Sequence, residues 1–145
     1  MFAGFNGRGA ALHPLHAILL GFPIALFTTA LVTDIAYLRT AQIQWTNFSS
    51  WLIVGALVTG ALVGLWAVIE LIVVWRRGSP GRRPFYVLAL ALMWGLGFIN
   101  ALQHSRDAWS SVGTLGLVLS ILCTVLAMVA GWIAFSAPAH REIAS

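Results

Sequence analysis

The stretch ALHPLHAILLGFPIALF, residues 11–27, decides the fold because it marks where the chain changes from polar to apolar. Two histidines, His13 and His16, flank a proline, and a long apolar run follows almost without interruption. A helix that crosses the hydrocarbon core of a bilayer needs about 20 predominantly apolar residues. The stretch therefore predicts the start of a transmembrane helix whose first turn carries two imidazoles.

The composition of the whole chain extends this prediction. The 145 residues are 60% hydrophobic and only 8% charged, with a mean hydropathy of +0.92, whereas roughly a quarter of the residues of a soluble domain are charged. Four apolar runs are long enough to span a membrane, at about residues 15–37, 51–75, 85–103 and 112–135. They lack the alternation of barrel strands. We therefore expect a single all-α domain over residues 1–145, an integral membrane four-helix up-down bundle.

Two further features bear on compartment and processing. The first apolar run is longer than that of a cleaved signal peptide, and no convincing small-residue cleavage site follows it. Cys123 is the only cysteine, so an intramolecular disulfide is excluded. A single thiol in an apolar segment is typical of a small core residue.

The basic residues predict an orientation. There is no lysine, and the four expected spans divide the eight arginines between the two sides, with Arg39 and Arg106 on one side. The other six lie on the opposite side: Arg8, Arg76, Arg77, Arg82, Arg83 and Arg141. The positive-inside rule then places both termini in the cytoplasm. The arginines indicate topology and contact with anionic lipid, and they do not form the basic patch of a nucleic-acid-binding protein.

Small residues at helical spacing predict close helix packing. Gly60 and Gly64 form a GxxxG pair in the second span. The fourth span carries a stripe of small residues at steps of three and four: Gly113, Gly116, Ser120, Cys123, Ala127, Ala130 and Ala134. Such stripes let helices approach closely in lipid. They indicate packing within the bundle or, on the Gly60–Gly64 face, a homodimer interface.

Ionisable residues within spans face the bundle interior or an aqueous cavity. His16 and Asp34 are eighteen residues apart in the sequence, which is five helical turns, so they share one inward face. Glu70 has the depth of His16, so His13, His16 and Glu70 are candidate ligands for zinc, iron or copper. The alternative is that Glu70 reaches the interface or pairs with Arg76 or Arg77. No known metal-binding motif accompanies these residues.

A second polar group is expected at the other membrane face. Asn100 and His104 lie on one helical stripe that runs into the segment HSRDAWSS, residues 104–111. Asp34 has the same depth, so we expect an inward polar network of Asp34, Asn100, Arg106 and Asp107, with His104 beside it. The alternative is that these polar residues only cap helix ends, since Asp107 and Ser110 also suit the start of the fourth helix.

The segments HPLHAILLGFPIALFTTALVTD, QWTNFSSWLIVGAL and INALQHSRDAWSSVGTLGLVLSI resemble a bacterial inner-membrane family. That family is catalogued as domain of unknown function twenty-two thirty-one. The resemblance covers about residues 12–135, and the HPxH opening followed by FPI is its most specific part. It implies a four-helix membrane protein associated with redox modules such as Rieske-type or cytochrome c domains. It also places His13 and His16 at the signature positions.

This resemblance favours a redox-chain-associated subunit that binds haem b or quinol and has redox partner proteins. For haem b, His16 is the first candidate ligand, His13 the second, and His104 belongs to a separate site at the other face. Because a bilayer core about 30 Å thick separates His16 from His104, a bis-histidine site would need His140 or a second protomer.

Two other functions stay open. One is a non-catalytic scaffold or assembly subunit of a larger membrane complex. The other is a small pore or proton relay that uses Asp34, Glu70 and the histidines, although no continuous polar stripe joins the two ends of the first span. No serine, cysteine or threonine has a base at motif spacing, which argues against a hydrolase. The sequence leaves enzymatic activity undecided.

Overall fold

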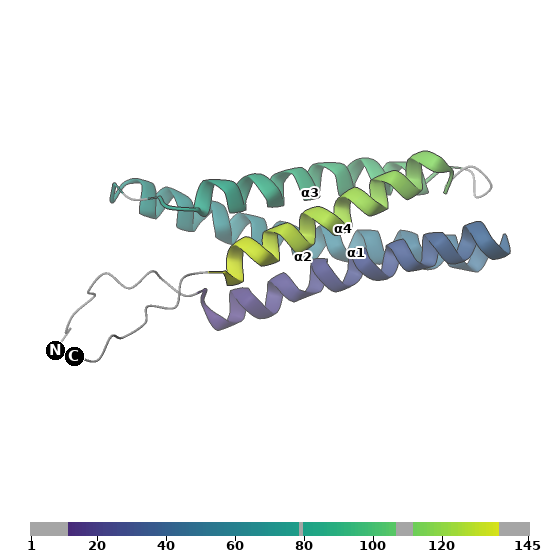
Figure 1. Cartoon of the computed structure of the whole chain (residues 1–145), viewed down its shortest axis with the longest axis horizontal. Coiled ribbons are helices and arrows are strands. Elements are labelled where there is room, and N and C mark those ends of the chain that lie inside the picture. Colours follow the sequence, from purple (N-terminus) through teal and green to yellow (C-terminus); the bar gives the residue numbers. More distant parts are fainter. Residues whose placement is uncertain (1–11, 79, 107–111, 137–145) are drawn as a thin grey trace.

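The computed structural model describes residues 12–78, 80–106 and 112–136, and these form four helices. They are α1 (Pro14–Thr40), α2 (Ile43–Trp75), α3 (Arg83–His104) and α4 (Thr114–Phe135). Each is long and apolar enough to cross a membrane. The expected all-α four-helix membrane bundle is therefore confirmed (Figure 1).

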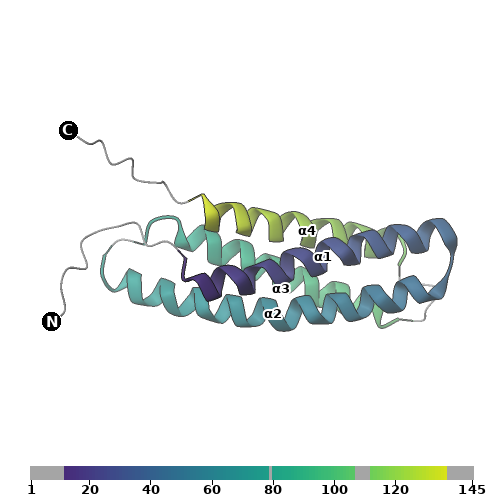
Figure 2. The ribbon, with the colours of Figure 1, turned by 90° about the horizontal axis from the view of Figure 1, so that it is seen from below.

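The helices run alternately up and down, and each packs on its neighbours in the ring α1, α2, α3, α4 (Figures 1 and 2). One end of the bundle holds the start of α1, the end of α4 and the α2–α3 connection. We name it the arginine end, after Arg76, Arg77, Arg82 and Arg83 in that connection and at the start of α3. The opposite end, near Asp34 and His104, is the aspartate end.

The helix boundaries differ from the sequence prediction most strongly at α2. Residues 43–50, expected in a loop, form its first two turns, so the α1–α2 connection is only Ala41 and Gln42. Ala41 makes the turn in the left-handed conformation, with φ of 53°. The segment is polar but lacks glycine and proline, and its inward residues Thr46 and Ser49 continue the buried stripe of α2. The other boundaries agree with the sequence prediction to within three residues, and the ends of α2 and α4 coincide with it.

Aromatic and small side chains fill the bundle axis. The ring of Phe27 on α1 lies against Gly97 on α3, where an added Cβ would be 2.7 Å from Phe27 Cζ. An added Cβ on Gly131 of α4 would similarly be 2.9 Å from Ile24 Cδ1. Most of the small-residue stripe of α4 is buried, including Cys123. This stripe therefore serves packing within the bundle.

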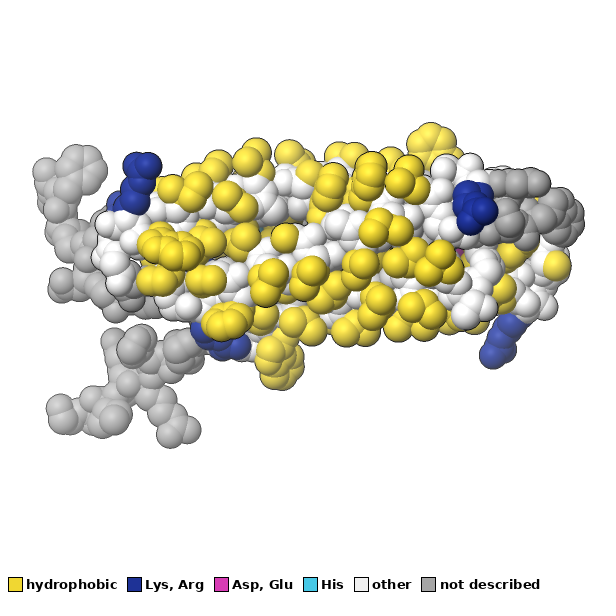
Figure 3. Space-filling view, turned by 90° about the horizontal axis from the view of Figure 1, so that it is seen from above, with side chains coloured by type: hydrophobic (Ala, Val, Ile, Leu, Met, Phe, Trp, Pro, Cys, Tyr) yellow, Lys and Arg dark blue, Asp and Glu magenta, His cyan; other side chains and the backbone are white. Residues whose placement is uncertain are grey.

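The outer surface is an apolar belt. Figure 3 shows hydrophobic side chains over the middle of the described surface and arginines toward its two ends. Large apolar residues such as Trp51, Leu65 and Trp132 are more than half exposed. Such a surface would be unstable in water and suits a lipid environment.

Candidate functional site

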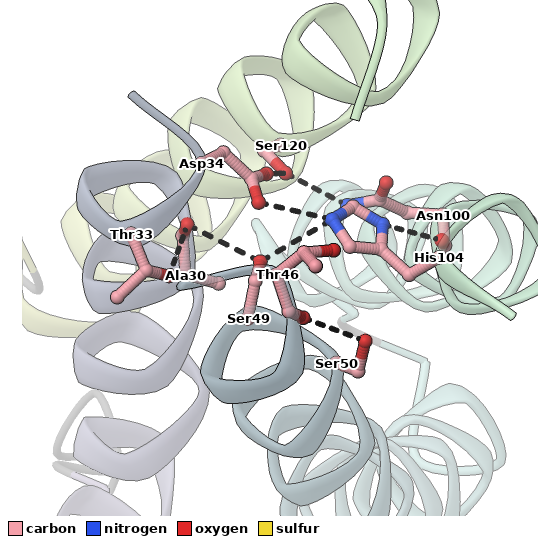
Figure 4. A network of polar contacts seen from close by, with 9 residues as sticks. All are labelled: Ala30, Thr33, Asp34, Thr46, Ser49, Ser50, Asn100, His104 and Ser120. Atoms are coloured by element: carbon pink, nitrogen blue, oxygen red, sulfur yellow. Dashed lines mark hydrogen bonds and ion pairs between the residues drawn. The ribbon is translucent and has the colours of Figure 1, made fainter. Parts of the chain in front are cut away.

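A buried polar cluster at the aspartate end joins all four helices. We name it the Asp34 cluster; it comprises Asp34 of α1, Ser49 of α2, Asn100 and His104 of α3, and Ser120 of α4. All five residues are buried, and Asp34 and Asn100 have no exposed surface. Figure 4 shows the Asp34 carboxyl group between Ser120 and the His104 ring. The helices converge on one carboxyl group because isolated polar groups are costly in an apolar interior.

The two ring nitrogens of His104 contact different partners. Nδ1 is 3.0 Å from the backbone carbonyl oxygen of Asn100, which can only accept, so Nδ1–H donates to it. Nε2 is 3.0 Å from Asp34 Oδ1 and 3.3 Å from Ser49 Oγ. His104 therefore has a polar contact at each ring nitrogen, and it gives the buried Asp34 carboxyl group a hydrogen-bond partner inside the membrane.

Ser120 and Asn100 extend this pair into a chain of hydrogen bonds. Asn100 Nδ2 donates to Ser120 Oγ at 2.9 Å, and Ser120 Oγ donates to Asp34 Oδ2 at 2.5 Å. On the opposite side, Ser49 Oγ donates to the carbonyl oxygen of Ala30 at 3.4 Å. Among the described residues, only Asn100 Oδ1 of this cluster is buried without a partner. Hydrogen bonds between different helices thus provide partners for nearly all of the buried polar groups of the Asp34 cluster.

The structure brings together part of the inward network expected from the sequence. Asp34, Asn100 and His104 meet as described above. Arg106 does not join them: its guanidinium is exposed and donates to Gln103 Oε1 at 3.4 Å, because it follows the end of α3. Asp107 lies outside the described residues.

A second polar cluster lies at the arginine end. We name it the His16 cluster; it comprises His13, the N-cap of α1, together with His16 of α1, Trp66 and Glu70 of α2, and Tyr86 and Arg83 of α3. His16 is fully buried, and its Nε2 is 2.8 Å from the Tyr86 hydroxyl group. Its other nitrogen, Nδ1, is buried and has no hydrogen-bond partner among the described residues. His16 thus differs from His104, which uses both ring nitrogens.

The indole of Trp66 organises this cluster. Its ring centroid is 5.3 Å from that of His16, edge to face, and 5.5 Å from that of His13. Its Nε1 donates to Glu70 Oε1 at 2.8 Å. Glu70 Oε2 is 3.9 Å from the Arg83 guanidinium, a loose ion pair of two partly exposed side chains. Glu70 pairs with Arg83, where the sequence suggested Arg76 or Arg77.

The expected metal site of His13, His16 and Glu70 is not assembled. Within residues 12–78, 80–106 and 112–136, no three His, Cys, Asp or Glu side chains are placed to hold a metal ion. The physical reason is that Trp66 contacts each of the three, while His16 binds Tyr86. His13 is exposed, and its Nδ1 accepts a hydrogen bond from the backbone N–H of Leu15 as a helix cap.

Sequence reasoning missed three contributors to these clusters. Ser49 was placed in a loop, although Thr46, Ser49 and Ile53 follow helical spacing and would have signalled an earlier start of α2. Ser120 was assigned only to the small-residue stripe, although a serine among glycine and alanine can also donate a hydrogen bond. Tyr86 stands near the start of an apolar run, and no sequence pattern marks it as a partner of His16.

The fold and the two buried clusters define a class: a small multi-pass membrane protein with polar groups buried at both ends of its bundle. Residues 12–139 match the family described as Predicted membrane protein (DUF2231), and the chain belongs to this family. No curated protein and no solved structure matches the chain.

Proposed function

We propose that this protein is a membrane subunit of a redox chain that binds a quinol at the His16 cluster. The observation that carries the proposal is the buried Nδ1 of His16, which has no partner among the described residues. Leaving such a group unpaired costs about 1–3 kcal/mol. Unsatisfied buried polar groups need an explanation, of which a functional role is one. The family resemblance to redox-associated proteins supports the same direction.

The chemistry of the cluster suits a quinol better than a haem. A quinol hydroxyl group can donate to His16 Nδ1, and the Trp66 indole offers an aromatic surface beside that ring. A bis-histidine haem would need two free imidazole nitrogens from facing helices. Instead, His16 Nε2 faces Tyr86, and His104 has contacts at both nitrogens. His140, the other ligand considered, lies outside the described residues.

The Asp34 cluster favours a second candidate function, a non-catalytic scaffold or assembly subunit. Its groups are occupied with one another and join four helices, so they stabilise the bundle and leave its outer surface for partners. A proton relay across the bundle has less support. Between the two clusters the described interior is apolar, with Leu20, Phe27 and Met93 fully buried.

A cofactor assay separates these functions. The protein is purified in mild detergent from quinone-replete bacterial membranes, extracted with organic solvent and analysed for quinone, and its visible spectrum is recorded. We expect bound quinone and no Soret band, with the quinone lost in His16→Phe and kept in Thr40→Phe, a change at an exposed residue of the same helix at the other end of the bundle. Quinone that survives His16→Phe would contradict the proposal. A Soret band would favour haem, and protein with neither would favour the scaffold.

We also propose a bacterial inner-membrane location, with the arginine end facing the cytoplasm. The support is the excess of arginines at that end. A reporter that fluoresces only in the cytoplasm, fused after Ser145, should be active, and a reporter active only in the periplasm should be inactive at the same position. The reverse pattern would overturn the orientation and leave the four-helix fold intact.

A further inference from the structure

A groove of about 290 Å³ lies on the outer surface between α2 and α3. Its α2 side runs from Gly60 to Val68 and its α3 side from Val87 to Trp94. The lining is overwhelmingly apolar, and Leu65 and Trp94 flank it with partly exposed side chains. Gly64 is open: an added Cβ there would meet no atom within 4 Å. The groove therefore faces the acyl chains of the bilayer.

The groove points toward the arginines of the α2–α3 connection. On α3 the groove-lining residues Val87, Leu90 and Trp94 are spaced three or four apart. Arg83 lies one helical turn before Val87, on the same face of the helix. On α2 the stripe of Leu65 and Val68 continues through Ile72 to the exposed Trp75, which Arg76 follows. An apolar channel thus leads to a positively charged rim at the membrane interface.

Two of these arginines are available for an anion. The Arg83 guanidinium lies near Glu70, and that of Arg82 donates to the carbonyl oxygen of Ser136 at 3.3 Å. The Arg76 and Arg77 side chains are exposed, and within the described residues their guanidiniums make no hydrogen bond or ion pair. Guanidinium groups bind phosphate oxygens strongly, often with two parallel hydrogen bonds.

We propose that this groove is a binding site for one anionic phospholipid. An acyl chain lies between Gly64 and Trp94, and the headgroup phosphate is bound by Arg76 and Arg77. Charge complementarity favours this occupant over a zwitterionic lipid. Charge also favours an anionic lipid over a second copy of the chain, since a parallel two-fold dimer through this face would bring two sets of arginines together.

The packing of α2 on α3 supports the same choice. Gly60, the inner residue of the GxxxG pair, is already covered, since an added Cβ would be 3.3 Å from Met93 Cε and 3.7 Å from Trp94 Cδ1. The flat glycine surface that a helix dimer needs is therefore absent from this described face.

Native mass spectrometry in detergent tests the site with two lipids of identical acyl chains, palmitoyl-oleoyl phosphatidylglycerol and palmitoyl-oleoyl phosphatidylcholine. We expect one phosphatidylglycerol retained per chain, with higher affinity than phosphatidylcholine. In the variant R76Q/R77Q, phosphatidylglycerol affinity should fall by about fivefold for each arginine. The affinity for phosphatidylcholine should stay the same.

A groove-filling variant tests the apolar half of the site. Gly64→Leu should weaken binding of both lipids by about tenfold or more, as expected when a well-packed contact is lost. Gly21→Leu is the matched control, because Gly21 on α1 is equally open and lies outside the groove. Size-exclusion chromatography establishes that both variants remain folded, and R76Q/R77Q tests the proposal independently of Gly64→Leu.

Three results would overturn the proposal. Equal affinity for the two lipids would show that the arginines do not select an anion. Unchanged binding in Gly64→Leu would place the lipid elsewhere. A dimer in the wild type that disappears in Gly64→Leu but not in Gly21→Leu would show that a second copy occupies the groove.

Discussion

At the aspartate end of the bundle, His104 contacts a carbonyl oxygen with one ring nitrogen and a carboxyl group with the other. At the arginine end, His16 contacts a tyrosine hydroxyl group with one nitrogen, and its other nitrogen has no partner among the described residues. Both imidazoles are almost completely buried. The same residue type thus stands in one nearly complete network and in one incomplete network.

The surroundings of the two histidines explain the difference. The Asp34 cluster draws side chains from all four helices and is closed off from solvent. The His16 cluster opens at its edge to Glu70 and Arg83, which are each about 30% exposed. A closed network holds helices together, whereas the cluster with an unused nitrogen and a polar edge is the one at which we propose that a ligand binds. The following predictions test that distinction.

The largest effect is expected from breaking the Asp34–His104 pair. Asp34→Leu or His104→Leu alone leaves a buried polar partner without its hydrogen bond, which costs about 3–5 kcal/mol. The double variant removes both groups and should lose less stability than the sum of the single variants. The measurement is the free energy of unfolding in detergent, followed by circular dichroism. Additive losses would show that the two residues act independently.

A smaller loss is expected from Ser120→Ala. This change removes the hydroxyl group that accepts from Asn100 and donates to Asp34, so two buried groups lose a partner at once. The expected cost is about 1–3 kcal/mol. The control is Ser50→Ala, because Ser50 Oγ donates only to the carbonyl oxygen of Thr46 within its own helix. Equal effects of the two changes would argue against a network that joins helices.

The sequence predicted the helices better than the contacts between them, for a physical reason. Length and hydropathy reveal a span because the bilayer core has a fixed thickness. Periodicity placed His16 and Asp34 on one inward face, and both are buried. The start of α2 was missed because residues 43–50 have a loop-like composition while Ser49 lies among buried groups.

Pairing depends on the relative rotation and depth of two helices, which no single helix encodes. Asn100 and His104 were expected near Asp34 from depth alone, but the contribution of Ser120 appears only when α4 is placed beside them. At the other end, the sequence put Glu70 near the histidines without revealing that the Trp66 indole contacts all three side chains. A long tryptophan side chain can contact several neighbours, and its direction follows from packing.

The smallest effect on stability is expected from Tyr86→Phe. The change removes the hydroxyl group next to His16 Nε2 and keeps the aromatic ring, whose centroid is 5.9 Å from that of His16. A hydrogen bond between membrane helices contributes about 0.6 kcal/mol on average, and water near the partly exposed Glu70 and Arg83 can replace the lost partner. The free energy of unfolding in detergent should therefore change by less than about 1 kcal/mol. Quinone content should fall, because a water molecule holds the His16 ring less firmly than the Tyr86 hydroxyl group does. A stability loss as large as that of His104→Leu, with quinone content unchanged, would contradict a ligand site. It would mean that the polar clusters at both ends of the bundle only stabilise the fold.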